Sequence, residues 1–392
     1  MPLAPMHRDT ATLLVARAMG PAVSVVLLAI LARQDGAADV GLYGLAAAVF
    51  SLLEAASSLG MRHLLPRELA RRDDRALLAS AAVACLSVGT VLALITGVST
   101  LWMRGGMATV VALAAAATPL AAVAVTEEGY WLARGRASRL AWALLAEQGV
   151  RLVVSLAALY LGAGVETLVA VMVLGRAVAV VLTLPPGGLT LWATNRSSLR
   201  VLWSEVPVFL GLEAVYQLYW RVDVLLLSAL TPLSEVGYYV AAYRVFSALL
   251  LLPQSYGQIL LPGMVKDGGR RLLRRGIIEM LVMGAVLGFV AAVGSAPLMR
   301  LVYGQGFERA ALVLTILSLG MVLASVDQPQ GRALVARGRQ RLDLTVLTVA
   351  TACNAALNLI LIPTHGAVGA AAATLVSLAV SVGGHALALR GT

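Results

Sequence analysis

Residues 39–51 read DVGLYGLAAAVFS, and residues 235–247 read EVGYYVAAYRVFS. The second stretch begins 196 residues after the first, which is half the length of the 392-residue chain. The same ungapped alignment places Leu-Leu-Pro at 64–66 on Leu-Leu-Pro at 260–262. The chain therefore consists of two related halves, and its fold depends on what each half contains.

The composition is that of an integral membrane protein. Sixty per cent of the residues are hydrophobic, only 13% are charged, and the mean hydropathy is +0.87. Soluble chains contain about 25% charged residues. The two cysteines provide neither a disulfide framework nor a metal-ligand spacing.

Apolar stretches long enough to cross about 30 Å of hydrocarbon recur along the whole chain. We predict an all-α integral membrane protein with about twelve transmembrane helices. The stretches are 11–33, 38–60, 76–102, 107–130, 139–162, 165–184, 201–229, 235–262, 272–299, 310–335, 341–363 and 367–390.

The distribution of basic residues predicts the orientation in the membrane. The connections after even-numbered stretches, together with the two termini, carry 20 of the 30 Lys and Arg residues, and five of these lie in residues 62–75. The odd-numbered connections carry four. Both termini are therefore expected in the cytoplasm. The same bias explains the net charge of +10 without a nucleic-acid partner.

Six helices in each half make the two repeats parallel, since each half starts on the same side of the membrane. We predict an N-terminal lobe over residues 1–190 and a C-terminal lobe over residues 197–392, arranged around a central cleft. Rocking of two similar lobes would open such a cleft to each side in turn, as alternating access requires.

Six arginines lie inside the predicted helices, where each costs about 2.5–3.5 kcal/mol at the helix centre unless it has a polar environment. Five of them are candidates for binding an anionic substrate, because guanidinium groups match phosphate well. By depth, three lie near the middle of the membrane, one toward the cytoplasm and one toward the outer side. These five are Arg151, Arg176, Arg244, Arg17 and Arg221.

Other polar side chains follow single faces of the predicted helices. Gln217 precedes Arg221 by four residues, Tyr239 and Tyr243 share a face, and so do Asn354 and Asn358. For single residues of this kind, hydrogen bonding between helices competes with substrate binding as an explanation. Among the intramembrane acids, the candidates for coupling an ion are Glu54, Asp223 and Asp327.

Common enzyme classes lack their residues in this chain. The single lysine, Lys266, follows valine, so no Walker A loop is present. The four histidines show no zinc-site spacing. We therefore expect neither an enzyme nor a bound metal or cofactor.

Three stretches together resemble a known family. They are DVGLYGLAAAVFSLLEAASSLG (39–60), WRVDVLLLSAL (220–230) followed by EVGYYVAAYRVFSALLLLP (235–253), and NAALNLILIPTHGAVGAAAATLVS (354–377). They resemble the Wzx-type polysaccharide flippases of the multidrug/oligosaccharidyl-lipid/polysaccharide exporter superfamily.

The resemblance implies a two-lobed transporter that moves undecaprenyl-pyrophosphate-linked oligosaccharide from the cytoplasmic to the outer leaflet. We expect the bacterial cytoplasmic membrane as the location, and the sequence leaves open whether a polysaccharide polymerase is a partner. The resemblance also implies arginines facing a central cationic cavity, a pattern that Arg17 and Arg221 match. Arg151 and Arg176 match no family motif and are assigned by depth.

Two alternatives remain open at this point. A multidrug antiporter of the same superfamily would carry cations, which the intramembrane arginines disfavour. A membrane-embedded sugar-polymer enzyme or a non-transporting scaffold would need no alternating cleft.

Overall fold

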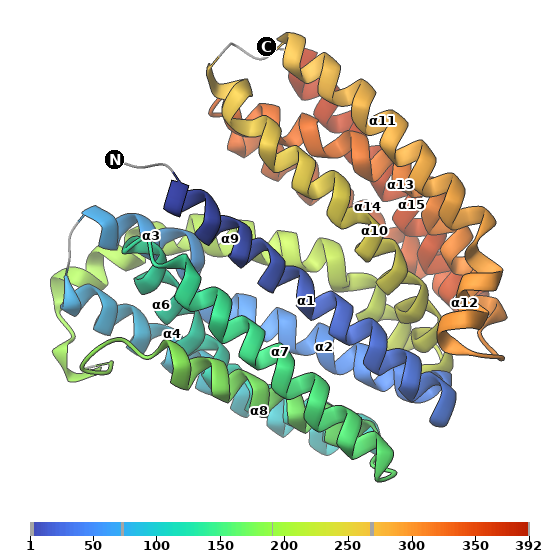
Figure 1. Ribbon diagram of the computed structural model, residues 1–392, viewed down its shortest axis with the longest axis horizontal. Coiled ribbons are helices and arrows are strands. Elements are labelled where there is room, and N and C mark those ends of the chain that lie inside the picture. The colour runs from blue at the N-terminus through green and yellow to red at the C-terminus, as the bar shows by residue number, and fades with distance from the viewer. Residues whose placement is uncertain (1–3, 72–73, 190, 267–269, 391–392) are drawn as a thin grey trace. The chain divides into compact units, whose positions relative to one another are not determined.

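A computed structural model describes residues 4–71, 74–189, 191–266 and 270–390 (Figure 1). Within these ranges nearly all residues are helical and none lies in a strand. The prediction of an all-α protein is therefore confirmed.

The helices, in chain order, have the following bounds. They are α1 (Ala4–Gln34), α2 (Ala37–Ser58), α3 (Met61–Arg71), α4 (Arg75–Ser99), α5 (Gly106–Ala116), α6 (Thr118–Ala133), α7 (Ala137–Tyr160), α8 (Val165–Thr183), α9 (Arg196–Leu230), α10 (Leu233–Lys266), α11 (Arg270–Val293), α12 (Ser295–Tyr303), α13 (Glu308–Ala336), α14 (Gln340–His365) and α15 (Ala367–Arg390).

Eleven helical segments of the described part are long and apolar enough to cross a membrane. Two of them combine neighbouring elements, α2 with α3 and α5 with α6. The predicted stretch 201–229 lies within α9, a continuous helix of 35 residues. The chain is thus a multi-pass membrane protein.

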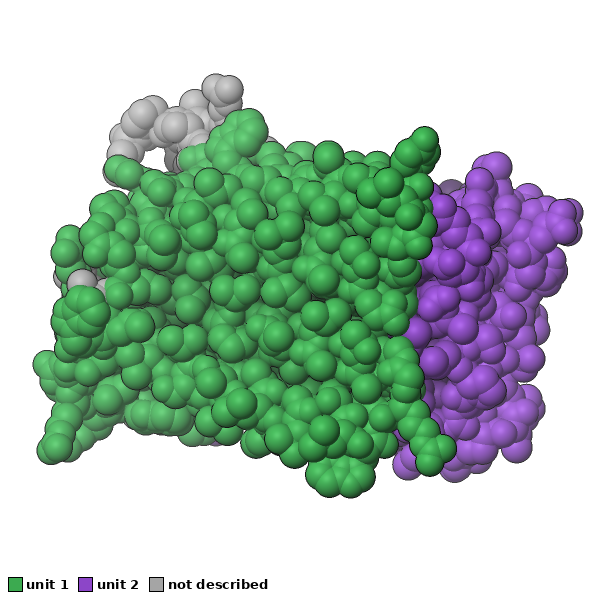
Figure 2. Space-filling model, turned by 90° about the horizontal axis from the view of Figure 1, so that it is seen from below, with its two compact units in different colours: residues 1–27, 45–217 green, residues 28–44, 218–392 purple. Residues whose placement is uncertain are grey.

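Two compact units make up the chain, and Figure 2 shows each in its own colour. Unit 1 contains residues 1–27 and 45–217, and unit 2 contains residues 28–44 and 218–392. The boundaries of these units differ from the boundaries of the sequence repeat. The lobes expected from the repeat, 1–190 and 197–392, therefore stay a prediction.

Within unit 2, the repeated sequence of α2 meets its own counterpart on α10. A Cβ atom on Gly41 would overlap the carbonyl oxygen of Leu233, and a Cβ atom on Gly237 would overlap the carbonyl oxygen of Ala37. Gly237 follows Gly41, and Leu233 follows Ala37, by the same 196 residues. The contact is therefore reciprocal, and it needs glycine on both helices because only small residues let two backbones approach so closely.

A break between α2 and α3 changes the direction of the chain in unit 1. Leu59 and Gly60 both have positive φ, at 50° and 71°. A side chain at Gly60 would also overlap Phe209. After the break, α3 resumes with Leu64 and Leu65 fully buried in a core that includes residues of α4 and α6. This packing fixes α3 and thereby positions Arg62, the second residue of that helix.

Candidate functional site

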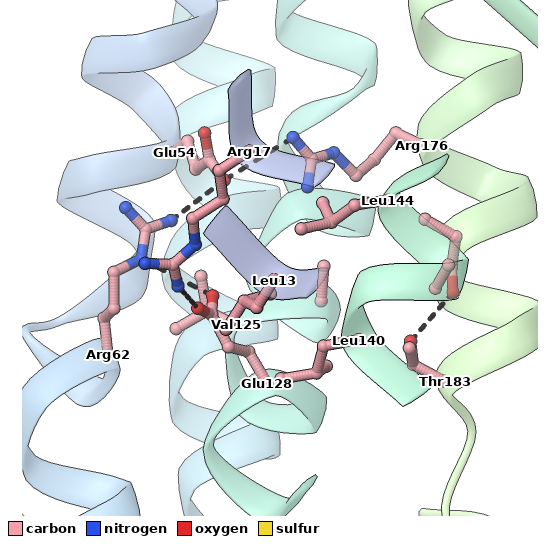
Figure 3. A pocket seen from close by; sticks show the side chains of 13 residues that line it. Leu13, Arg17, Glu54, Arg62, Val125, Glu128, Leu140, Leu144, Arg176 and Thr183 are labelled. Atoms are coloured by element: carbon pink, nitrogen blue, oxygen red, sulfur yellow. Dashed lines mark hydrogen bonds and ion pairs between the residues drawn. The ribbon is translucent and has the colours of Figure 1, made fainter. Parts of the chain in front are cut away.

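A cavity of about 420 Å³ lies inside unit 1, between α1, α2, α3, α6, α7 and α8 (Figure 3). This volume falls in the range of about 300–1,000 Å³ typical of ligand sites. Its apolar lining comes mainly from Leu and Ala side chains. The polar lining residues are Arg17, Glu54, Arg62, Glu128, Arg176 and Thr183.

Arg62 is surrounded by carboxylates. Its guanidinium lies 3.1 Å from Glu54, 3.7 Å from Glu128 and 3.7 Å from Glu213. These acids come from α2, α6 and α9. One guanidinium therefore holds three helices of unit 1 to α3.

Arg176, on α8, approaches the same carboxylate from the other side. Its guanidinium lies 3.8 Å from Glu54 and 3.6 Å from Glu147, and its centre lies 5.7 Å from the ring centroid of Phe50. In Figure 3 the side chains of Arg62 and Arg176 extend toward each other, and Glu54 is shared between them.

Arg17 is the most accessible of the three arginines. Its side chain is 53% exposed, against 31% for Arg62 and 18% for Arg176. A hydrogen bond of 2.7 Å joins it to Glu128. Because it is half exposed on α1, Arg17 is the guanidinium that a ligand entering from solvent can reach with the least rearrangement.

The electrostatic character of the cavity is mixed. Three arginines and two glutamates line it, which gives one net positive charge. Glu147 and Glu213 stand behind the lining, with side chains only 6% and 8% exposed. Counted together with the lining, they give four glutamates for three arginines, so each arginine of the cavity has a carboxylate partner.

Two other predicted residues of unit 1 lie outside the cavity lining. Arg151 donates to Gln148 at 2.8 Å and to Ser24 at 3.5 Å. Gln217 donates to Glu213 at 3.2 Å and so supports a carboxylate that faces Arg62.

Unit 2 contains a second polar cluster, buried around Asp223 of α9. One carboxylate oxygen accepts hydrogen bonds from the Tyr239 hydroxyl at 2.5 Å and from Thr374 at 3.0 Å. The other oxygen accepts from the Asn358 amide at 2.6 Å. The same amide donates to Asn354, which in turn donates to Ser377 at 3.3 Å. Asp223 is thus stabilised by neutral donors from α10, α14 and α15.

The remaining predicted residues also belong to unit 2. Tyr243 stacks on Tyr239, with ring centroids 5.8 Å apart. Arg221 and Arg244 are partly buried, on α9 and α10. Asp327, on α13, accepts hydrogen bonds from Ser381 and contacts His385. Among the described residues, no group of three or more His, Cys, Asp or Glu is arranged to hold a metal ion.

A family model described as "Polysaccharide biosynthesis protein" matches residues 6–266, which is more than half of the chain. The chain belongs to this family. A relative from Haloferax volcanii, described as "Probable low-salt glycan biosynthesis flippase Agl15", is 30% identical over 175 residues. That match spans 43% of this chain and 37% of the relative, so it covers well under half of either protein.

Solved structures of transporters share the fold of this family member. The lipid II flippase MurJ in an inward closed conformation superposes with a TM-score of 0.82 at 12% identity, over 96% of this chain and 87% of that one. An inward-facing multidrug resistance MATE family transporter of the MOP superfamily gives 0.73 at 15% identity, over 96% and 95%. These likenesses show the fold, and together with the family match they confirm the resemblance to the exporter superfamily.

Sequence reasoning missed three polar residues of the cavity in this family member, which are Arg62, Glu128 and Thr183. Arg62 counted as part of a basic connection, and Glu128 was one of several unassigned acids. The signal for Arg62 is the Leu59–Gly60 break followed by the renewed apolar pattern of residues 61–71, which predicts a second helix rather than a loop. No sequence signal pairs Glu128 with Arg17, because the two residues lie 111 positions apart.

Proposed function

We propose that this family member is a flippase that moves undecaprenyl-pyrophosphate-linked oligosaccharide from the cytoplasmic to the outer leaflet by alternating access. The family match places the chain in polysaccharide biosynthesis. The observation that carries the proposal is the convergence of Arg17, Arg62 and Arg176 on one cavity inside the membrane-spanning helices.

The pyrophosphate would bind where the arginines now contact carboxylates. Paired guanidinium groups avoid the cost of unpaired charge while the site is empty. A pyrophosphate offers several oxygens with the geometry that the planar guanidinium prefers. In this account Arg17 meets the anion first, and Arg62 and Arg176 hold it deeper, while Glu54 and Glu128 give up their partners.

The duplicated halves support alternating access as the mechanism of transport. In the proposed orientation both termini are cytoplasmic and the membrane is the bacterial inner membrane. An inside-negative potential contributes about 2.3 kcal/mol per charge for each 100 mV, which favours outward movement of a pyrophosphate dianion. The polyprenyl tail would stay in lipid throughout. A polysaccharide polymerase would receive the product.

The predicted residues outside the cavity keep proposed roles. Arg151 and Gln217 would support the anion site through Gln148 and Glu213. Arg221, Arg244 and Tyr243 would contact the headgroup in the course of transport, and the buried Asn354–Asn358 pair would act through Asp223. Asp223, with its full set of hydrogen bonds, is the candidate for coupling an ion, and Tyr239 positions it.

Translocation in proteoliposomes tests the proposal. A fluorescent polyprenyl-pyrophosphate oligosaccharide is incorporated, and its arrival in the outer leaflet is followed by quenching. We expect flipping by the wild type and slower flipping at low probe concentration in Arg17→Gln, which removes the charge at the most exposed position. Wild-type protein that is folded but leaves the probe unflipped would contradict the proposal.

A second candidate function is a cation antiporter of the same superfamily. Glu54 and Glu128 in the cavity lining favour it, because a cationic substrate needs carboxylates. Uptake of a cationic dye in the same vesicles distinguishes the two functions. Dye transport that depends on Glu128 and is retained in Arg17→Gln would favour the antiporter.

A further inference from the structure

His385 of unit 2, on α15, lies between two carboxylates. The Nδ1 atom of His385 lies 2.8 Å from Asp327, and its Nε2 atom lies 3.0 Å from Asp343. Ser381 also hydrogen-bonds both carboxylate oxygens of Asp327, at 3.0 and 3.1 Å. The imidazole is 5% exposed, and its two carboxylates are 19% and 31% exposed.

The hydrogen-bond inventory of this cluster requires an extra proton. Ionised carboxylates only accept hydrogen bonds, and a neutral imidazole has one N–H donor. Two ring nitrogens that both contact carboxylates therefore need either an imidazolium or a protonated aspartate. Without that proton, one of the two contacts would set a nitrogen lone pair against a carboxylate oxygen, and the contact would open.

Three helices meet at this cluster. The charged groups that face the imidazole are Asp327 from α13 and Asp343 from α14, while His385 and Ser381 are on α15. The helix α10 also packs against α15, and none of its described charged side chains contacts the imidazole. Loss of the proton would thus break a hydrogen bond that joins α15 to α13 or to α14.

The cluster lies close along α15 to the network around the buried Asp223. Asp343 is three residues from the start of α14, and it is the most exposed member. On α15, Ser381 contacts Asp327, and one helical turn earlier Ser377 accepts from Asn354 of the Asp223 network. A turn of helix rises about 5.4 Å, so the two networks are separated by a single step.

We propose that His385, Asp327 and Asp343 form a proton-binding site that couples proton movement to transport. The proton enters at Asp343, resides on the imidazole between the two carboxylates, and passes by way of Asp327 toward Asp223. The coupling role rests on the proposed transport function, whereas the proton site itself does not.

Nuclear magnetic resonance of labelled histidine tests the site directly. The chain has four histidines, and His385→Gln identifies the signal by its loss. We expect protons on both ring nitrogens of His385 in the wild type, and the loss of one of them at the same pH in Asp327→Asn and in Asp343→Asn. A single ring proton on His385 in the wild type, or two ring protons in both aspartate variants, would overturn the proposal.

Transport measurements test the coupling separately. In vesicles that carry the fluorescent oligosaccharide probe, an imposed pH gradient should accelerate flipping by the wild type and by the control His365→Asn. The acceleration should be lost in His385→Gln and in the milder Asp343→Asn, with flipping at equal pH retained. An unchanged response to the gradient in a folded variant would overturn the coupling role. Absence of flipping by the wild type would refute the proposed function while the resonance result still decides the proton site.

Discussion

The cavity of unit 1 and the Asp223 cluster of unit 2 solve the same problem by different means. Both place charge inside membrane-spanning helices. In unit 1, arginines and glutamates neutralise one another around an accessible space. In unit 2, a single buried carboxylate is held by hydroxyl and amide donors. In the proposed function, the first arrangement would exchange its carboxylate partners for an anion, and the second would bind and release a cation.

The largest expected effect comes from removing the guanidinium that ties unit 1 together. Arg62→Ala leaves Glu54, Glu128 and Glu213 without their shared partner, and breaking a buried ion pair costs about 3–5 kcal/mol. We expect a large loss of thermal stability in detergent and no flipping. Restoring charge balance with Arg62→Gln and Glu54→Gln together should recover stability but not flipping. Recovery of both would mean that Arg62 has only a structural role.

Removing the carboxylate of unit 2 should have a smaller effect on stability and a clear effect on transport. Asp223→Asn keeps the shape of the side chain and loses its charge, and a disturbed buried hydrogen bond costs about 1–3 kcal/mol. We expect a folded protein whose flipping no longer responds to an ion gradient. A gradient response equal to that of the wild type would place the coupling elsewhere and break the contrast between the units.

Arg17→Gln should separate binding from stability within unit 1. An exposed ion pair contributes about 0.2–1 kcal/mol, so the unfolding temperature should barely change. A charged hydrogen bond to the ligand contributes about 1.5–3 kcal/mol, which corresponds to a loss of tenfold or more in apparent affinity for the probe. Concentration dependence of flipping measures this loss. Equal affinity in the variant would remove Arg17 from the anion site.

The smallest effect is expected at Arg151, which lies beside the cavity. It donates hydrogen bonds to Gln148 and Ser24, and it does not line the cavity itself. We expect Arg151→Gln to flip the probe within about threefold of the wild type, because glutamine can still hydrogen-bond Gln148 and the loss stays near the lower end of about 0.5–1.5 kcal/mol. A loss as large as that of Arg17→Gln would extend the anion site toward α7.

Much of the fold can be predicted from the sequence, because each membrane helix is recognisable from its own residues. Their length and apolar character are set by the bilayer, so the stretches 139–162 and 367–390 nearly coincide with α7 and α15. The break at Leu59–Gly60 is harder to predict, because the residues on both sides are helical. Only the positive φ angles of these two residues mark the interruption. That single break decides whether Arg62 belongs to a loop or to a cavity.

The polar faces could be predicted, but their partners could not. Asn354 and Asn358 share a face of α14, as their spacing indicates, and both join the Asp223 network. Which helix lies opposite depends on packing between segments more than 130 residues apart. Tyr239 shows the same limit, because its stacking with Tyr243 is local whereas its bond to Asp223 is not.

The reciprocal contact of Gly41 and Gly237 has a historical meaning. In a two-fold symmetric dimer, residue i of one subunit meets residue j of the other, and the same pair recurs with the subunits exchanged. Gly41 with Leu233 and Gly237 with Ala37 repeat that pattern inside one polypeptide. The contact is what two copies of a single ancestral half would have made on associating. In such a dimer, one glycine codon supplied the glycine on both sides of the interface. In the fused chain, Gly41 and Gly237 are encoded separately, and each must be retained.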